Sequence, residues 1–196
     1  MSKILFTIGH STHPIIQFIH LLKQQAITAI CDIRSHPYSR YNPQFNKKSL
    51  QKSLEQHGIT YIFLGKELGA RSENPACYIN GKVQYQLLIN EPSFQQGLVQ
   101  LKAHLENHIL ALMCAEKDPI TCHRMILVCR EIRSSVKNIN HILADGSLEK
   151  NEETENRLLQ FHKIVPDLLK DKEICILEAY SKQEQAIAYF NKNMHK

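Results

Sequence analysis

Apolar residues along the chain form short runs that alternate with segments of helical spacing. The runs at residues 4–8, 27–33, 59–64 and 109–113 are rich in β-branched and aromatic side chains, and they predict buried strands. A further strand is predicted at Asn140–Leu143. Between the first two runs, apolar residues recur at i, i+3, i+4 and i+7, which is typical of one buried helix face (Ile15, Phe18, Ile19 and Leu22). Further helices are predicted at residues 47–57, 94–106 and 125–136.

The alternation of strands and helices predicts the fold class. The connections between strands are too long for hairpins, so we expect an α/β fold with a mostly parallel sheet of about five strands and helices on both faces. Residues 72–92 have no clear pattern and are expected to be irregular. Beyond residue 150 the pattern changes to two helices, at 152–164 and 181–191. We therefore expect an α/β domain at 1–150 that carries the site, and a helical extension at 151–196 packed on it.

Length and composition favour a cytoplasmic protein. The chain has 196 residues, 43% of them hydrophobic, and no apolar run approaches the roughly 18 residues of a membrane span. Its start lacks the pattern of a signal peptide. The six cysteines are therefore expected to be reduced thiols, and the absence of a Cys-x-x-Cys pair excludes a zinc ribbon and a thioredoxin motif.

The positive charge is concentrated in one part of the chain. Eight basic and three acidic residues lie between Arg34 and Lys82, which accounts for the net charge of +5. This excess favours an anionic partner, although an ordinary solvated basic face explains it equally well. Aromatic and basic residues are interleaved in the Arg34–Lys52 loop of this segment, at Tyr38, Arg40, Tyr41 and Phe45. They predict either stacking on nucleic acid or a lid over the site, while the chain has no sequence-specific nucleic-acid motif.

Residues with chemical function follow the predicted strands. Parallel strands end at the same edge of a sheet, where open α/β folds bind their ligands. The residues expected there are Gly9, His10 and Ser11 after the first strand, Asp32 and Arg34 at the end of the second, Arg71 in the loop after the third, and Cys114 and Glu116 after the fourth. Cys122, His123 and Arg124 begin the next helix. The sequence therefore predicts one composite site.

Each group in this site has a functional and a structural interpretation. The segment Gly9–Thr12 is predicted to enter a helix N-terminus, which favours an anion, or Ser11 only caps that helix while His10 packs below the loop. Asp32 and Arg34 share a strand face. They either bind and orient an anionic substrate, with Asp32 as a base, or form an internal ion pair.

The two cysteines near the fourth strand allow three interpretations. Cys122 in a first helical turn beside His123 favours a thiolate, and either Cys122 or Cys114 could be a nucleophile. Both could instead be buried fillers, as we expect for Cys31, Cys129 and Cys175. A metal site would use Cys114, Cys122, His123 and His10, but the spacing of the two cysteines matches no common zinc motif.

These segments together resemble the domain-of-unknown-function-488 family. The resemblance rests on Thr7–Ser11, Cys31–Arg34, Pro37–Arg40, Leu64–Gly69, Leu112–Lys117, Cys122–Arg124 and His141-Ile142, with smaller matches at 45–46 and 58–61, and it covers residues 4–146. The family more often has Asp-Val-Arg and Leu-Gly-Gly where this chain has Asp-Ile-Arg and Leu-Gly-Ala. The resemblance implies a cytoplasmic, mostly bacterial α/β protein without a settled activity. Some relatives carry labels that connect them to DNA repair.

The leading functional hypothesis is a small enzyme that acts on a phosphate-bearing or nucleotide-like substrate. Its catalytic residues would be Cys114, Glu116, Cys122, His123, His10 and Asp32, and its substrate-binding residues Gly9, Ser11, Arg34, Arg40, Arg71 and Arg124. A non-catalytic nucleotide or nucleic-acid binding module and a zinc protein are the alternatives. The sequence identifies no cofactor.

Overall fold

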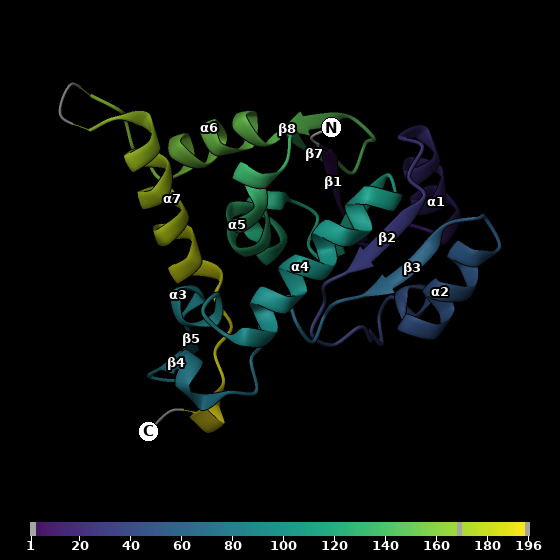
Figure 1. The fold of residues 1–196 in the computed structure, drawn as a ribbon, viewed down its shortest axis with the longest axis horizontal. Helices are drawn as coiled ribbons and strands as arrows, with labels where there is room; N and C mark the ends of the chain where they lie inside the picture. The colour runs from purple at the N-terminus through teal and green to yellow at the C-terminus, as the bar shows by residue number, and fades with distance from the viewer. Residues whose placement is uncertain (1–2, 168–169, 195–196) are drawn as a thin grey trace.

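A six-stranded sheet forms the centre of the molecule in the computed structural model, which describes residues 3–167 and 170–194 (Figure 1). The strand order is β3-β2-β6-β1-β7-β8. The strands are β1 (Ile4–Gly9), β2 (Ala29–Asp32), β3 (Thr60–Phe63), β6 (Leu110–Cys114), β7 (Asn138–Ile142) and β8 (Leu148–Lys150). All neighbouring strands are parallel except β8, which pairs antiparallel with β7. The predicted α/β class and mostly parallel sheet are confirmed.

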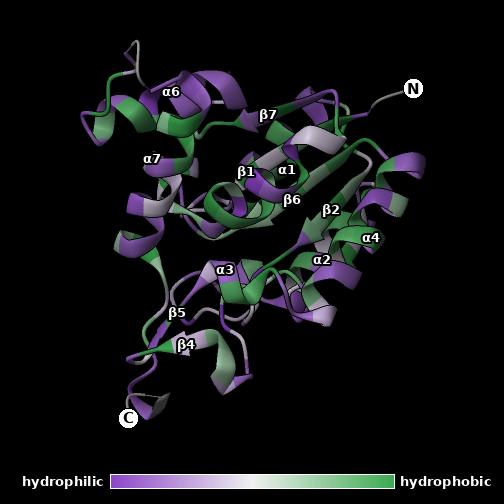
Figure 2. Cartoon of the chain, turned by 60° about the vertical axis from the view of Figure 1, so that its left-hand side comes forward, coloured by the Kyte–Doolittle hydropathy of each residue, from purple (hydrophilic) through white to green (hydrophobic). Residues whose placement is uncertain are grey.

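Helices cover both faces of the sheet and form two hydrophobic cores. On one face, α1 (Ile15–Gln24) and α2 (Lys47–Glu55) bury their apolar sides against β1, β2 and β6. On the other face lie α4 (Pro92–Asn107), a π-helical segment at Arg124–Cys129 that continues into α5 (Arg130–Ile132), α6 (Asn151–Phe161) and α7 (Lys172–Ile187). Figure 2 shows hydrophobic residues concentrated in the central strands and long hydrophilic stretches on α6.

The sixth strand is an addition to the predicted sheet. β8 has three residues, of which only Leu148 is apolar, so no hydrophobic run marks it. It follows a tight turn at Gly146, whose φ is +89°. The strand forms because β7 offers it an unpaired edge, and this edge is a property of the fold rather than of the local sequence.

The segment predicted to be irregular contains short regular elements. Strands β4 (Tyr78–Ile79) and β5 (Lys82–Val83) form a two-stranded antiparallel sheet, and α3 (Tyr85–Leu88) follows. The turn between the strands uses positive φ at Asn80 and Gly81, which Asn and Gly adopt most readily. Strands of two residues are too short to show an alternating pattern, which is why the prediction missed them.

The C-terminal helices differ from their predicted boundaries. α6 ends at Phe161 rather than 164, and Lys163 has a positive φ of 54° just beyond it. The last helix, α7, runs from Lys172 to Ile187, so the prediction of 181–191 was wrong. Cys175, Ile176, Ala179 and Tyr180 form the buried face of its first half at helical spacing, so this part of the helix could have been predicted from the sequence. Within the predicted domain at 1–150 and extension at 151–196, residues 1–2, 168–169 and 195–196 lie outside the described residues.

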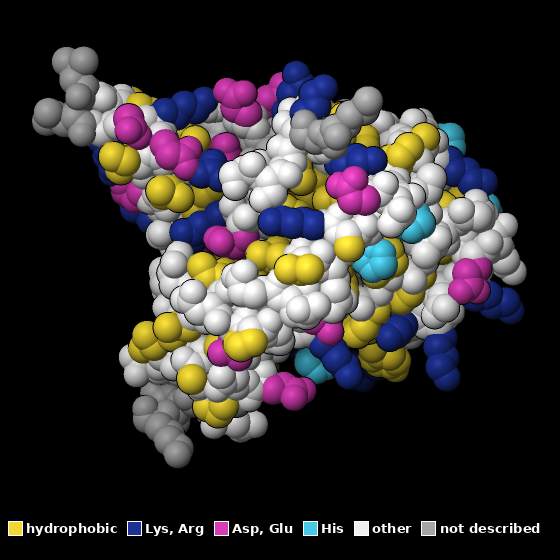
Figure 3. Space-filling view, viewed as in Figure 1, with side chains coloured by type: hydrophobic (Ala, Val, Ile, Leu, Met, Phe, Trp, Pro, Cys, Tyr) yellow, Lys and Arg dark blue, Asp and Glu magenta, His cyan; other side chains and the backbone are white. Residues whose placement is uncertain are grey.

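The molecular surface is mixed in charge on the face shown in Figure 3, where basic and acidic side chains are interspersed and apolar ones are scattered. Scattered exposed apolar side chains are normal for a folded protein. Among the helices of residues 3–167 and 170–194, none has the length and apolar character needed to cross a membrane.

Candidate functional site

The carboxyl ends of β1, β2 and β6 meet at one edge of the sheet. The ladder between β1 and β6 continues beyond the strands, because the backbone N–H groups of His10 and Ser11 donate to the carbonyls of Cys114 and Ala115 at 2.9 Å each. The structure thus brings together the segments that the sequence placed at the strand ends.

Four side chains converge just beyond β6. Cys114 ends the strand, Glu116 lies in the following loop, and Cys122 and His123 immediately precede the π-helical segment. The thiols of Cys114 and Cys122 both donate to Glu116 Oε2, at 3.0 and 2.9 Å. Cys114 Sγ lies 3.5 Å from His123 Nδ1. We call these four residues the tetrad, and their ligand-type atoms all lie within 4.8 Å of one another.

Surrounding groups fix the orientation of the tetrad. His123 Nε2 donates to the carbonyl of Ile33 at 3.0 Å, so its Nδ1 carries the lone pair that faces Cys114. The backbone N–H of Arg124 donates to Cys122 Sγ at 3.4 Å. The Arg124 guanidinium is fully buried and donates to the carbonyls of Glu116, at 2.6 Å, and Lys117, at 3.1 Å. Arg124 therefore holds the loop that carries Glu116 in place.

Gly9 allows the loop to lie this close to β1. A Cβ atom at Gly9 would lie 1.9 Å from the carbonyl oxygen of Glu116 and 3.2 Å from the Arg124 guanidinium. Only glycine permits this close approach. Gly9 is therefore needed for the space that it leaves, since its backbone conformation is an ordinary one.

The two thiols of the tetrad differ in acidity. Burial, together with the neighbouring Cys122 and Glu116, raises the pKa of Cys114 well above its usual range. Burial alone would also raise the pKa of Cys122, but the hydrogen bond with Cys114 and the charge of Arg124 lower it well below its usual range. Contact with Cys122 raises the pKa of His123 despite its burial. The acidic thiol is therefore the one beside Arg124.

Asp32, Arg34 and His10 form a second cluster beside the tetrad. The Arg34 guanidinium makes a two-pronged ion pair with Asp32, with Nε–Oδ1 at 2.9 Å and Nη2–Oδ2 at 2.6 Å, and it also donates to the Phe45 carbonyl. Its remaining nitrogen lies 3.1 Å from His10 Nε2. The Tyr61 hydroxyl donates to Asp32 Oδ2 at 2.7 Å. The cluster stabilises the loop after β2. Asp32 and Arg34 thus form the internal ion pair of their structural interpretation.

His10 is held in its neutral form. Its Nδ1 donates to the Ser11 carbonyl at 2.9 Å, so Nε2 accepts from Arg34. Burial and the positive charge of Arg34 lower the pKa of His10 to about 4. The ring stacks on Phe45 with a centroid distance of 4.3 Å. His10 is not part of the tetrad, in which Glu116 takes the place that the metal hypothesis gave to it.

The predicted helix cap at Ser11 is wrong. α1 begins at Ile15, its N-cap position is Pro14, and no side chain caps it. Ser11 lies in the turn before it with a positive φ of 47°, and its backbone N–H pairs with Ala115. Ser11 and its neighbours therefore lie ahead of the helix start and do not cap it.

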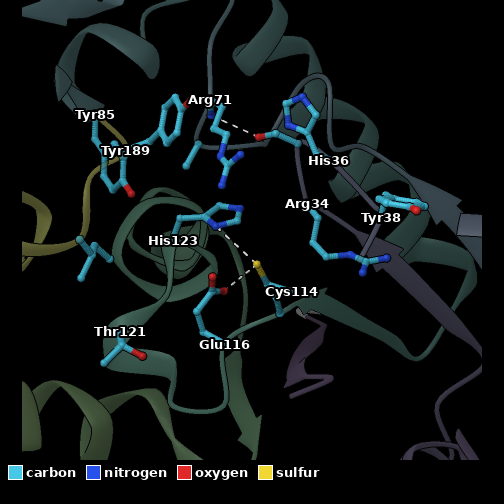
Figure 4. Close-up of a pocket in the computed structure, with 14 residues that line it drawn as sticks. Arg34, His36, Tyr38, Arg71, Tyr85, Cys114, Glu116, Thr121, His123 and Tyr189 are labelled. Carbon is cyan, nitrogen blue, oxygen red and sulfur yellow. Dashed lines mark hydrogen bonds between the residues drawn. The ribbon is translucent and has the colours of Figure 1, made fainter. Parts of the chain in front are cut away.

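A cavity of about 280 Å³ opens over the tetrad. Cys114, Glu116 and His123 line it, whereas Cys122 does not. The remaining lining residues come from the loops after β2 and β3, from α3, from the segment after β6 and from the end of α7 and beyond (Arg34, Ser35, His36, Tyr38, Ala70, Arg71, Tyr85, Ala115, Thr121, Ile187 and Tyr189). Figure 4 shows the Arg71 guanidinium directed toward His123 above the tetrad.

The sequence analysis missed part of the cavity wall. His36, Tyr85 and Tyr189 line it without belonging to any predicted site. Tyr189 lies far along the chain from the other lining residues, and its ring packs 4.4 Å from the Arg71 guanidinium. No local pattern marks such a contact. Arg40, in contrast, is exposed on its loop beside Tyr41 and does not line the cavity.

Comparison with known proteins identifies the family. Neither the search of curated proteins nor the search of solved structures found a match. A family model described as "Domain of unknown function DUF488" matches residues 14–130, which is more than half of the chain and includes the tetrad, Asp32, Arg34 and Arg71. The chain therefore belongs to the DUF488 family.

Proposed function

We propose that the chain is a small-molecule enzyme whose substrate carries a phosphate or a similar anionic group and reacts at the tetrad. The supporting observation is the cavity, which combines the Cys114 thiol, a carboxylate and an imidazole at its floor, with the Cys122 thiol behind them and a cationic side chain above. Thiol, carboxylate and imidazole groups attack electrophiles, transfer protons or bind metals, and a concave site that gathers them is a typical reaction centre.

Arg71 is the cation best placed to bind the anionic group. Its guanidinium makes no salt bridge within the part of the chain that the structure describes, and its side chain is exposed at the cavity wall. Arg34 and Arg124 were also expected to bind substrate, but Arg34 donates to Asp32 and Phe45. Arg124 is fully buried outside the cavity lining, and both of its terminal nitrogens donate to backbone carbonyls. The proposal therefore assigns binding of the anionic group to Arg71 and the exposed His36.

The test is ligand binding followed by a turnover assay. Isothermal titration calorimetry with inorganic phosphate and with nucleoside monophosphates should detect binding to the wild-type chain. Arg71→Ala should weaken it at least about tenfold, the loss expected for a charged hydrogen-bond partner. Arg40→Ala is the matched control, because it removes the same charge outside the cavity. Equal affinities in wild type and Arg71→Ala would overturn the proposal.

Binding of single-stranded nucleic acid is a second candidate function. Its support is the exposure of Tyr38 and Tyr41, which are 72% and 85% accessible on a basic loop next to the cavity. Exposed aromatic rings beside cations are the usual platform for unpaired bases. In the same titrations, a short oligonucleotide whose affinity falls steeply with salt, and falls further in Arg40→Ala than in Arg71→Ala, would favour this function.

A further inference from the structure

The tetrad has the donor set and the geometry of a transition-metal site. Two sulfur atoms, one imidazole nitrogen and one carboxylate oxygen lie within 4.8 Å of one another. Tetrahedral zinc places such atoms about 3.3–3.8 Å apart, given bonds of about 2.0–2.3 Å. The Cys114–His123 contact of 3.5 Å lies within this range. The Glu116 oxygen, 3.0 and 2.9 Å from the two sulfur atoms, is held at the fourth corner by hydrogen bonds from the thiols, and these bonds are lost when the thiols give up their protons to bind a metal.

The groups around the tetrad match the support that metal ligands need. The hydrogen bond from His123 Nε2 to Ile33 fixes the ring and directs the Nδ1 lone pair inward, as outer partners of ligating histidines commonly do. The backbone N–H of Arg124 donates to Cys122 Sγ, and its guanidinium holds the Glu116 backbone. These contacts hold the ligand atoms in place before any ion binds.

We infer that Cys114, Cys122 and His123 bind a zinc ion at the cavity floor, and that Glu116 on the cavity side holds a water molecule at the fourth position. The inference rests on the proposed function and deepens it by assigning the reaction class. Thiolate and imidazole ligands in a tetrahedral arrangement select zinc over harder cations. Both thiols bind as thiolates, so zinc binding displaces their protons.

The arrangement assigns hydrolysis as the reaction. Three protein ligands leave one position open, as in catalytic zinc sites, and Glu116 is the exposed member that lines the cavity. Zinc lowers the pKa of a bound water, and Glu116 accepts one of its protons. The water oxygen then forms a bond to the electrophilic atom of the substrate. The bond to the leaving group breaks, and Glu116 returns the proton to that group.

Metal analysis of the full chain tests the site. The wild-type protein is purified under reducing conditions, reconstituted with zinc, desalted and measured by elemental mass spectrometry, and we expect about one zinc per chain. Cys122→Ser and His123→Asn should each retain less than about a tenth of that content. Cys129→Ser is the matched control, because Cys129 is as buried as Cys122 but lies at the end of the following π-helical segment, outside the tetrad. Circular dichroism verifies that each variant is folded.

The cobalt form tests the open position without requiring a substrate. Cobalt bound by two thiolates gives intense charge-transfer absorption, which Cys114→Ser should lose together with the metal, as Cys122→Ser loses its zinc. Azide should change the visible spectrum of the wild-type cobalt form, because it can occupy the fourth position. Glu116→Gln should retain the metal and the azide response. Loss of zinc in Glu116→Gln would make this residue a fourth ligand and overturn the hydrolytic assignment.

The metal site and the proposed anion binding can fail independently in these experiments. No zinc in the wild type, or equal zinc in wild type and Cys122→Ser, overturns the metal site whatever the cavity binds. Arg71→Ala should retain its zinc, because Arg71 is not in the tetrad. A zinc-loaded chain that binds neither phosphate nor nucleotides would overturn the anion proposal and leave the metal site intact.

Discussion

At the residue scale, His141 connects the sheet to the C-terminal helices. It is fully buried on β7 and accepts a hydrogen bond from the Thr7 hydroxyl at 2.8 Å. Its Nε2 donates to the Asn151 side-chain oxygen at 3.2 Å, and Asn151 in turn donates to Glu155. Burial, reinforced by the charge of Arg124, lowers the pKa of His141 to about 3. The ring is therefore neutral in the folded protein across the physiological range.

This burial predicts how stability depends on pH. In the unfolded chain a histidine binds a proton below its ordinary pKa of 6.5, whereas folded His141 does so only near pH 3. Stability is thus complete above about pH 6.5 and is lost as the pH falls toward 3. His141 alone should cost about 2 kcal/mol between pH 7 and pH 5.

Urea unfolding at a series of pH values measures this effect. The wild-type free energy of unfolding should fall on acidification, and the slope should be shallower in His141→Gln. His20→Gln is the control, because His20 is exposed on α1. A slope that His141→Gln leaves unchanged would show that other groups dominate the acid response.

At the element scale, α7 supports the loop that presents Cys122. The Gln183 side chain is 2% accessible, and its amide donates to the carbonyl of Ile120 at 2.8 Å. On the same helix, Glu184 accepts from the backbone N–H of Tyr85 at 2.7 Å, next to the cavity wall. A helix late in the chain thus fixes two segments of the site.

Replacing Gln183 should therefore affect both stability and the site. Gln183→Met keeps most of the side-chain volume but leaves the Ile120 carbonyl without this donor, which costs about 1–3 kcal/mol. We expect a lower midpoint of urea unfolding and a lower affinity of the tetrad for zinc, measured by competition with a chelator. Gln185→Met, an exposed position on the same helix, should change neither value. Wild-type zinc affinity in Gln183→Met would mean that the loop holds its position unaided.

The elements that the sequence predicted well are those whose signal is local. The parallel strands and the helices at 47–55 and 92–107 have buried apolar faces that recur at a fixed period. β8 depends on its pairing with β7, and its own residues are too polar to mark it. The same difference applies to the site: the tetrad follows from strand ends and one helix start, whereas Tyr189 reaches the cavity through tertiary packing alone.

At the scale of the whole molecule, one hydrophobic core joins the sheet to the C-terminal helices. Leu158 of α6 and Ile176, Ala179 and Tyr180 of α7 are buried in the same cluster as Leu127 of the π-helical segment. Tyr180 also donates to Glu155, which pairs with Arg133 beyond α5. The residues after 150 thus cover the helical segment that follows Cys122.

This shared core predicts that residues 1–150 do not form a stable fold by themselves. Burial of each large side chain contributes about 1.5–3 kcal/mol, so the loss of several is comparable with the roughly 5–15 kcal/mol of net stability of a typical domain. Without α6 and α7, the apolar face of residues 124–132 would also be exposed. We expect the shortened chain to aggregate, or to unfold without a cooperative transition.

Size-exclusion chromatography and urea unfolding distinguish this outcome from an independent domain. A chain that ends at residue 191 is the control and should behave as the full chain, because it retains α6, α7 and the pairing of Asn191 with Gly81. If the 1–150 chain were monomeric, unfolded cooperatively and bound one zinc, the C-terminal helices would be an appendage to a self-sufficient domain. Its failure would instead make them part of the core that positions the tetrad, so that the site depends on residues on both sides of 150.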